Sequence, residues 1–229
     1  MSAGPETPLD GTSGARVPGA RAPVAGTASL TRLIDRLAAL RDGTGRRRLV
    51  ALAGPPASGK STLAGALGAA LPGSVVVPMD GFHLDDGLLR AAGLHARKGS
   101  PDTFDVAGLD CLLQRIVADE GTVHIPVFDR GRELSRAAAA SVLPEHRLVI
   151  VEGNYLLLDE PPWRSLAAHF DLTVLLQVSE PELERRLLQR WREHGLDEAG
   201  ARLKADVNDL PNGRRVLAGS LRPDLVIPG

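Results

Sequence analysis

Residues 49–62 read LVALAGPPASGKST, where an apolar run gives way to glycine and proline and then to a lysine followed by two hydroxyl residues. Residues 54–61 match G-x-x-x-x-G-K-[ST], and the match lies after a run of strand length and before a helical pattern, as a phosphate-binding loop requires. In such a loop, backbone N–H groups and the start of the next helix surround phosphate oxygens. The stretch therefore predicts a site for a nucleoside triphosphate.

Individual residues of this loop have distinct expected roles. Gly54 and Gly59 let the backbone curl around the phosphates, and Lys60 is expected to reach the β and γ phosphates of ATP. Ser61 offers a hydroxyl to Mg²⁺, which prefers oxygen ligands and usually keeps several waters. The predicted nucleotide-contacting residues are Gly54, Pro55, Pro56, Ala57, Ser58, Gly59, Lys60, Ser61 and Thr62.

Strand-like and helical patterns alternate along the chain on both sides of the loop. Apolar runs of strand length lie at 48–53, 74–79, 147–153, 172–178 and 224–228. Helical patterns lie at about 60–71, 106–118, 135–141, 161–169 and 180–194, and an amphipathic helix capped by Ser29 is predicted over 29–41. Continuous apolar runs fit strands buried on both faces. We expect an α/β fold, a P-loop NTPase-type three-layer sandwich whose parallel sheet has about five strands with helices on both faces.

Composition limits the classes of partner. The chain has 229 residues, 27 basic and 28 acidic side chains, and a single cysteine, Cys111. A formal net charge of −1 provides no bulk positive field for nucleic acid or anionic lipid. No apolar run approaches the roughly 20 residues that a membrane-spanning helix needs. We expect a cytoplasmic protein with a small-molecule acceptor as its partner, without nucleic acid or membrane, and leave a homodimer open.

The first residues differ in composition from the remainder. Residues 1–27 are rich in Gly, Pro, Ala, Ser and Thr and lack the apolar centre of a secretion signal, which favours a disordered tail. A transit peptide is the alternative, because two arginines lie there, but Glu6, Asp10 and several prolines disfavour an amphipathic helix. Residues 28–229 are then expected to form one domain.

Two acidic residues stand at the ends of predicted strands. Asp80 directly follows the run 74–79, and Glu152 closes the apolar part of 147–153, so both are expected at the carboxyl edge of the sheet, where ligands bind. Asp80 is predicted to orient an acceptor hydroxyl and take its proton. Glu152 is predicted to support Mg²⁺. The alternative for Asp80 is a tight turn with Gly81.

These segments occur in an order that resembles a known family. GPPASGKS (54–61), MDGFH (79–83), RKGSPDTFDV (97–106), PVFDR (126–130) and VEGNY (151–155) together resemble the uridine kinase and phosphoribulokinase superfamily. Bacterial P-loop pantothenate kinase is similar too. The resemblance covers about residues 48–229. It implies that Asp80 is the catalytic aspartate and that Glu152 is the acid of the Walker B strand.

The same resemblance implies part of an acceptor site. PDTFD at 101–105 is similar to the PDAFD segment of uridine kinases, which bring a ring and a carboxylate to the nucleoside. Phe104 and Asp105 would then line the acceptor. The alternative for Asp105 is a cap on the helix that begins at Val106.

A second segment modifies this implied acceptor site. PVFDR resembles the family's PxYD strand, with Phe128 in place of tyrosine, which disfavours uridine or cytidine as acceptor. Arg130 and Arg132 depart from the uridine kinase pattern and favour an anionic or polyhydroxylated acceptor. The predicted acceptor-contacting residues are Asp80, His83, Phe104, Asp105, Phe128, Arg130, Arg132 and Tyr155.

Arginines follow the fourth predicted strand. The segment SEPELERRLLQRWREHG (179–195) begins a helix and resembles the lid of related kinases, which we place around 180–205. Arginines at such a position can neutralise charge that develops on the transferred phosphoryl group. Arg186 and Arg190 are the candidates, alongside Lys60 and Asp80 as the other catalytic residues.

The leading hypothesis is an ATP- and Mg²⁺-dependent kinase that transfers the γ-phosphoryl group to an alcohol of a nucleoside, a sugar or a pantothenate-like compound. A regulatory P-loop ATPase or an interaction protein, which binds nucleotide without a small-molecule acceptor, is the alternative. A nucleotide-dependent switch is disfavoured because the sequence has no N-K-x-D string for guanine selection.

Overall fold

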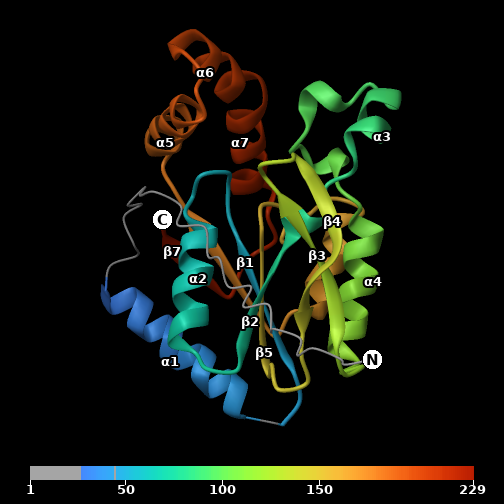
Figure 1. Cartoon of the computed structure of the whole chain (residues 1–229). Helices are drawn as coiled ribbons and strands as arrows, with labels where there is room; N and C mark the ends of the chain where they lie inside the picture. Colours follow the sequence, from blue (N-terminus) through green and yellow to red (C-terminus); the bar gives the residue numbers. More distant parts are fainter. Residues whose placement is uncertain (1–26, 44) are drawn as a thin grey trace, which may run out of the picture.

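The computed structural model describes residues 27–43 and 45–229 and is built on one parallel sheet (Figure 1). The strand order is β2-β5-β1-β6-β7, and every pairing in this sheet is parallel. The strands are β1 (Arg48–Ala53), β2 (Ser74–Pro78), β5 (Leu148–Gly153), β6 (Leu172–Gln177) and β7 (Leu225–Pro228). Each predicted run agrees with its strand to within one residue at either end, so the predicted sheet is confirmed.

Helices cover both faces of the sheet, which confirms the three-layer sandwich. On one face, α1 (Thr27–Asp42) and α2 (Lys60–Ala70) bury leucines such as Leu37 and Leu67 against β1 and β5. On the other face, α4 (Val106–Val117) and the short helix η4 (Trp163–His169) pack against the sheet. The helix α1 begins at Thr27, so Ser29 lies inside it and the predicted cap at Ser29 is wrong. The predicted tail, residues 1–27, otherwise lies outside the described residues.

An antiparallel hairpin replaces one predicted helix. The predicted helix 135–141 is instead the strand β4 (Leu134–Val142), which pairs with β3 (Val123–Asp129). Alanine-rich sequence favours a helix in isolation, but pairing with β3 satisfies this backbone, and only Val142 of β4 is buried. The register shifts from Ile125 opposite Ala140 to Val127 opposite Arg136, which leaves extra residues in β4. Tertiary pairing thus overrides local propensity here.

Helices at the carboxyl end of the sheet form a separate packed group. They are α5 (Glu180–Glu193), α6 (Glu198–Lys204), the π turn η5 (Ala205–Asp209) and α7 (Leu210–Gly219). Leucines of α5 and alanines of α6 and η5 make a small core of their own. Figure 1 shows α5, α6 and the short helix α3 (Asp86–Ala91) at the same end of the sheet. Within the described part of the chain, no helix is long and apolar enough to cross a membrane.

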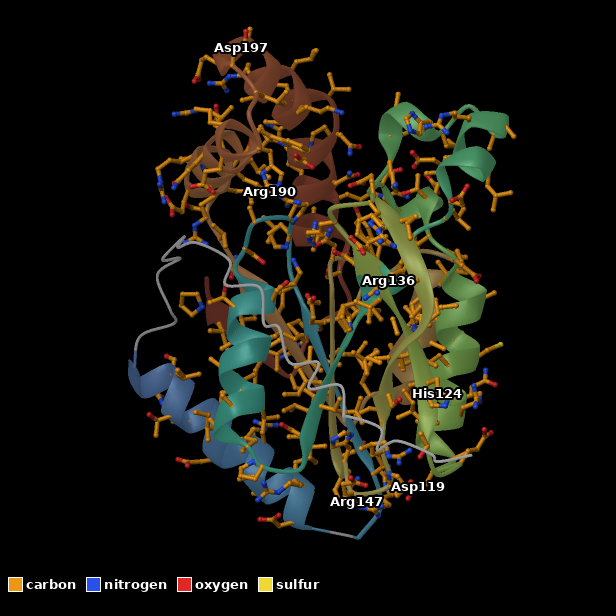
Figure 2. The ribbon with its side chains drawn as sticks, viewed as in Figure 1. Asp119, His124, Arg136, Arg147, Arg190 and Asp197 are labelled. Carbon is orange, nitrogen blue, oxygen red and sulfur yellow. The ribbon has the colours of Figure 1, made fainter. Side chains whose placement is uncertain are left out.

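A buried arginine holds the opposite end of the fold. Arg47 is 1% exposed and pairs with Asp119 at 2.8 Å. Its guanidinium also donates to the backbone carbonyls of Ile116, Gly121, Leu143 and His146. Asp119 and Arg147 lie together at this end in Figure 2, away from Arg190. Arg47 therefore joins β1 to the end of α4 and to the turn before β5.

Candidate active site

The P-loop lies between β1 and α2, as predicted. Gly59 caps α2 with a φ of 95°, a left-handed conformation that favours glycine. Ala57 also has a positive φ, of 59°. The side chain of Lys60 folds back so that its Nζ donates to the carbonyl of Pro55 at 2.8 Å. The loop is thus wrapped around the start of a helix, the arrangement that receives phosphate.

Burial sets the electrostatics of Lys60. Its side chain is enclosed, and this burial lowers the pKa of the ammonium from 10.5 to about 8, although the Glu152 and Asp80 carboxylates oppose the shift. A buried cation without a full counter-charge is costly. A polyphosphate placed in the loop would supply that charge.

Ser61 and Glu152 form a pair of oxygen donors beside the loop. Ser61 Oγ donates to Glu152 Oε1 at 3.2 Å, because parallel pairing sets Glu152 on β5 next to Leu52 near the end of β1. Burial raises the pKa of Glu152, and nearby Lys60 opposes that shift. In residues 27–43 and 45–229, no cluster of three or more His, Cys, Asp or Glu could hold a metal by itself. The pair suits Mg²⁺ completed by phosphate oxygens and water.

Asp80 lies in the short 3₁₀ turn η1 (Met79–Phe82) directly after β2. Met79 and Phe82 are buried, and a Cβ on Gly81 would run into the backbone of Pro126 on β3, so the turn is held tightly. Asp80 lines a cavity together with Lys60, and its Oδ2 accepts a hydrogen bond of 2.7 Å from Arg130 Nη2. Asp80 therefore belongs to a tight turn and also lines the cavity, so the two interpretations of this residue are compatible.

An aromatic wall stands beside Asp80. Residues 82–84 run antiparallel to 103–105, and this places the His83 and Phe104 rings in a stack with centroids 4.1 Å apart. The ring centroid of Phe128 lies 4.8 Å from that of His83, and the two rings are tilted by 52°. Burial lowers the pKa of His83 to about 4, so its imidazole is neutral at pH 7. Its Nδ1 is buried and has no hydrogen-bond partner among the described residues.

Three predicted acceptor residues lie outside the cavity lining. Asp105 caps α4 by accepting from the Gly108 N–H at 2.8 Å, which confirms the capping alternative. Tyr155 is buried in the core, and its hydroxyl donates to the carbonyl of Gly99 at 2.6 Å. Arg132 is exposed on the β3–β4 turn. The acceptor role of these three residues stays a prediction, and their side chains cap a helix, support a loop or face solvent.

Not every predicted nucleotide residue faces the cavity either. Pro56, Ala57, Gly59, Lys60, Ser61 and Thr62 line it. Gly54, Pro55 and Ser58 lie behind this surface, where the Pro55 carbonyl holds Lys60 and the Ser58 carbonyl accepts from Arg186 at 3.3 Å.

The two predicted arginines approach the P-loop from α5. Arg186 is 8% exposed, its Nε donates to Glu182 at 2.7 Å, and its Nη2 has no hydrogen-bond partner in the part of the chain described. Arg190 lines the cavity one turn later (Figure 2). Burial lowers the pKa of Arg190, and the positive charge of Arg130 lowers it further. Arg190 therefore lies in the electrostatic field of both Arg130 and Asp80.

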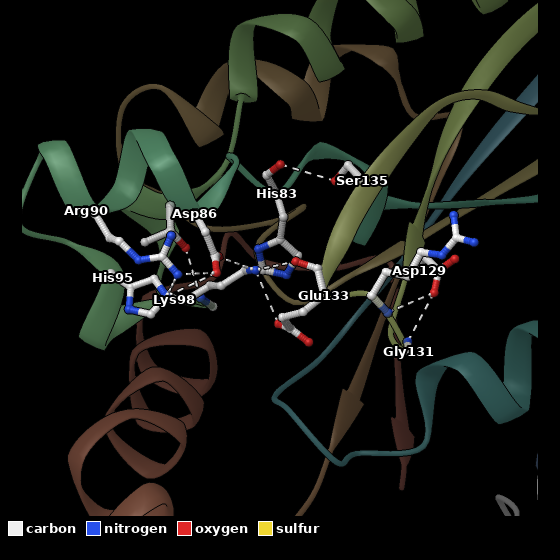
Figure 3. A network of polar contacts seen from close by, with 12 residues as sticks. His83, Asp86, Arg90, His95, Lys98, Asp129, Gly131, Glu133 and Ser135 are labelled. Carbon is white, nitrogen blue, oxygen red and sulfur yellow. Dashed lines mark hydrogen bonds and ion pairs between the residues drawn. The ribbon is translucent and has the colours of Figure 1, made fainter.

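A polar network around Lys98, Asp86 and Glu133 lines the cavity, and the sequence did not predict it (Figure 3). Lys98 Nζ donates to Asp86 Oδ1 at 2.8 Å and to the Glu133 carbonyl at 2.9 Å, and it lies 5.2 Å from the Phe128 ring centroid. The hydrogen bond from Lys98 is the main cause that lowers the pKa of Asp86 to about 2. The only sequence signal was a basic loop at 96–98, a kind of segment that more often faces water.

These elements enclose one continuous cavity of about 690 Å³. It extends from the P-loop past Asp80 to the aromatic wall, with α5 and η5 on the remaining side. Its size suits a ligand pocket. The P-loop lies at one end of this cavity, and Asp80 and the aromatic wall line the same cavity.

No protein-family model matches the chain. It is 37% identical over 202 residues to the uncharacterized protein YggC of Escherichia coli K12, covering 85% of this chain and 84% of that protein. It is 34% identical over 197 residues to the "Putative uridine kinase C227.14" of Schizosaccharomyces pombe, covering 80% and 83%. A crystal structure described as a "putative fructose transport system kinase" from Silicibacter sp. TM1040 has a TM-score of 0.82 at 46% identity, covering 87% and 98%.

The sheet order and the loop define a P-loop protein of the kinase type. The chain belongs to the P-loop kinases of the uridine kinase, phosphoribulokinase and pantothenate kinase superfamily, as the sequence predicted. The names of these relatives support an ATP-using small-molecule kinase and do not agree on one acceptor.

Proposed function

We propose that this protein is a Mg²⁺- and ATP-dependent kinase that transfers the γ-phosphoryl group to an alcohol of a small, neutral, polyhydroxylated acceptor, with a sugar as the leading class. The observation that carries the proposal is that Asp80 lines the same cavity as the P-loop lysine on one side and the His83 aromatic wall on the other.

On the donor side, this chain supplies charge and position. Lys60 would meet the β and γ phosphates, and Ser61 with Glu152 would hold Mg²⁺. The metal, when bound, neutralises charge on the phosphate oxygens. Arg186 and Arg190 both line the cavity that contains the P-loop, so both can stabilise charge on the transferred group.

On the acceptor side, Asp80 would act as the general base. Arg130 occupies Oδ2 of the carboxylate, so Oδ1 is the oxygen offered to the acceptor hydroxyl. The hydroxyl proton passes to Asp80 while the acceptor oxygen bonds to the γ phosphorus. The bond from that phosphorus to the β–γ bridging oxygen breaks, and ADP leaves with the electron pair. General-base assistance of this kind contributes about 10²- to 10⁴-fold.

Charge pairing favours a neutral acceptor over an anionic one. Arg130 is paired with Asp80, and Lys98 is paired with Asp86 and Glu133. An anionic acceptor would have to break one of these pairs, whereas hydroxyl groups can add hydrogen bonds to them. The neutral His83 ring lines the cavity and adds no charge that would attract an anion. Of the two acceptor classes expected from Arg130 and Arg132, anionic and polyhydroxylated, we therefore favour the polyhydroxylated one.

Sugar and nucleoside acceptors fit the aromatic wall in different ways. Rings at His83, Phe104 and Phe128 can cover the apolar face of a sugar or stack on a base. Relatives with names of both kinds exist. Phe128 lacks the tyrosine hydroxyl that could contact a base, and the polar network of Lys98 can bond to hydroxyl groups. Both features support a sugar over a nucleoside as the acceptor.

An acceptor panel tests the proposal. The protein with ATP and Mg²⁺ would be offered ketoses, aldoses, polyols, nucleosides, pantothenate and glycerate, and ADP release would be followed. We expect ADP release that depends on a neutral polyhydroxylated compound. Release stimulated only by the carboxylates would contradict the neutral-acceptor class. ADP release that no compound stimulates would favour the regulatory ATPase instead.

A further inference from the structure

The π turn η5 presents two consecutive polar residues to the cavity. Asn208 and Asp209 both line it, whereas Val207 before them is 59% exposed. A π turn widens the helix locally and is frequent at functional sites. Neither residue has a role in the phosphoryl transfer derived above.

The Asn208 amide is held in one orientation. Its Oδ1 accepts from Nδ2 of Asn212, which is 4% exposed, at 3.1 Å. Its Nδ2 then donates to the backbone carbonyl of Lys98 at 2.9 Å. A buried asparagine thus fixes which end of Asn208 faces the loop.

The loop that receives this hydrogen bond lines the cavity through His95, Ala96, Lys98 and Gly99. We call residues His95–Ser100 the acceptor loop. The carbonyl of Gly99 is held by the Tyr155 hydroxyl at 2.6 Å, and the Gly99 N–H donates to Thr103 Oγ1 at 2.9 Å. The Lys98 side chain reaches Asp86 and Glu133 (Figure 3). Lys98 therefore bonds through its side chain to Asp86 and Glu133 and through its backbone carbonyl to Asn208 of η5.

The other side of η5 is tied to the arginine helix α5. Trp191 Nε1 donates to Asp209 Oδ2 at 2.6 Å. Leu187 of α5 and Ala205 of η5 share one buried core. The helix α5 also carries Arg186 and Arg190, which line the cavity that contains the P-loop. Two consecutive residues of η5 thus connect the arginine helix to the acceptor loop.

We propose that Asn208 is a positioning residue that couples nucleotide binding at α5 to the order of the acceptor loop. The inference rests on the proposed function, in that the P-loop cavity must bind a nucleoside triphosphate. Coupling of this kind is reciprocal, so a loop ordered by nucleotide binds acceptor better, and bound acceptor strengthens nucleotide binding.

Hydrogen exchange with a non-hydrolysable ATP analogue and Mg²⁺ tests the coupling without a known acceptor. In the wild-type protein, the analogue is expected to slow exchange in peptides that cover residues 94–103 as well as in the P-loop. In Asn208→Asp, the donor is replaced by an oxygen of the same size, so P-loop protection should persist while protection at 94–103 falls roughly fivefold, the scale of one lost hydrogen bond. Val207→Ala, in the same turn but exposed, should behave as wild type.

The outcomes separate the two proposals. Absence of P-loop protection in the wild type would overturn the nucleotide site and this inference with it. P-loop protection with no change at 94–103, or equal protection of the loop in Asn208→Asp, would overturn the coupling alone. Asn208→Ala serves as a second variant should the aspartate destabilise the turn. Once an acceptor is known, either variant should raise its KM with nucleotide affinity nearly unchanged.

Discussion

Nucleotide affinity should weaken at alkaline pH because of the burial of Lys60. The pKa of this ammonium is about 8 in the free protein, against an ordinary value of 10.5. Phosphates favour the charged form, so nucleotide binding returns the pKa to at least its ordinary value. Below pH 8, binding needs no proton. Above pH 8, the neutral amine must take up a proton on binding, and the affinity falls as the pH rises.

The size of the effect follows from the two pKa values. Between about pH 7.5 and about pH 9.5, the dissociation constant should rise roughly 20-fold, and binding should take up close to one proton at the upper end. The terminal phosphate of ATP is ionised throughout this range, because phosphate monoesters have a second pKa near about 6. The sequence has three lysines, Lys60, Lys98 and Lys204, so few other amines compete.

Isothermal titration calorimetry in buffers of different ionisation enthalpy measures both quantities. Lys98→Met should keep the pH dependence, and Lys60→Met should bind weakly with an affinity that no longer depends on pH in this range. A wild-type affinity that stays constant from about pH 7.5 to about pH 9.5 would refute the account of a buried, depressed lysine.

Three further substitutions separate stability from chemistry. Arg47→Met should lower the free energy of unfolding by about 1–3 kcal/mol, because it removes the donor from the buried carbonyl of Ile116, with nucleotide affinity unchanged; urea unfolding checks this. Tyr155→Phe should cost about 1–2 kcal/mol by freeing the Gly99 carbonyl, and should raise the acceptor KM in steady-state kinetics more than the KM for ATP. Glu152→Gln should raise the Mg²⁺ concentration for half-maximal activity roughly tenfold or more in a metal titration, and an unchanged requirement would remove Glu152 from the metal site.

Local patterns predicted the sheet and the place of the P-loop between β1 and α2. The P-loop, Asp80 and Glu152 could each be assigned to the end of a strand, because each follows or closes an apolar run in the sequence itself. The strand β4 was mistaken for a helix because its alanines carry local helix propensity, whereas its pairing with β3 is a tertiary contact.

Residues distant in sequence explain what was missed at the acceptor end. Lys98 and Asn208 are 110 positions apart, so neither stretch signals the hydrogen bond between them. Family resemblance brought Asp105 and Tyr155 into the predicted acceptor site, yet one caps a helix and the other supports a loop from the core. The resemblance pointed to segments that contribute Phe104, Phe128 and Arg130 to the cavity lining, but it did not decide which side chains of those segments reach the cavity.

Transfer of labelled phosphate tests the central claim most directly. The protein would be incubated with ATP labelled at the γ phosphate, Mg²⁺ and the neutral sugar that stimulates ADP release most strongly, and the products would be separated. We predict that the label appears in a sugar phosphate ester, and that Asp80→Asn lowers its rate about 100-fold or more while nucleotide affinity is kept. Label found only in inorganic phosphate, or an Asp80→Asn rate close to wild type, would contradict the account.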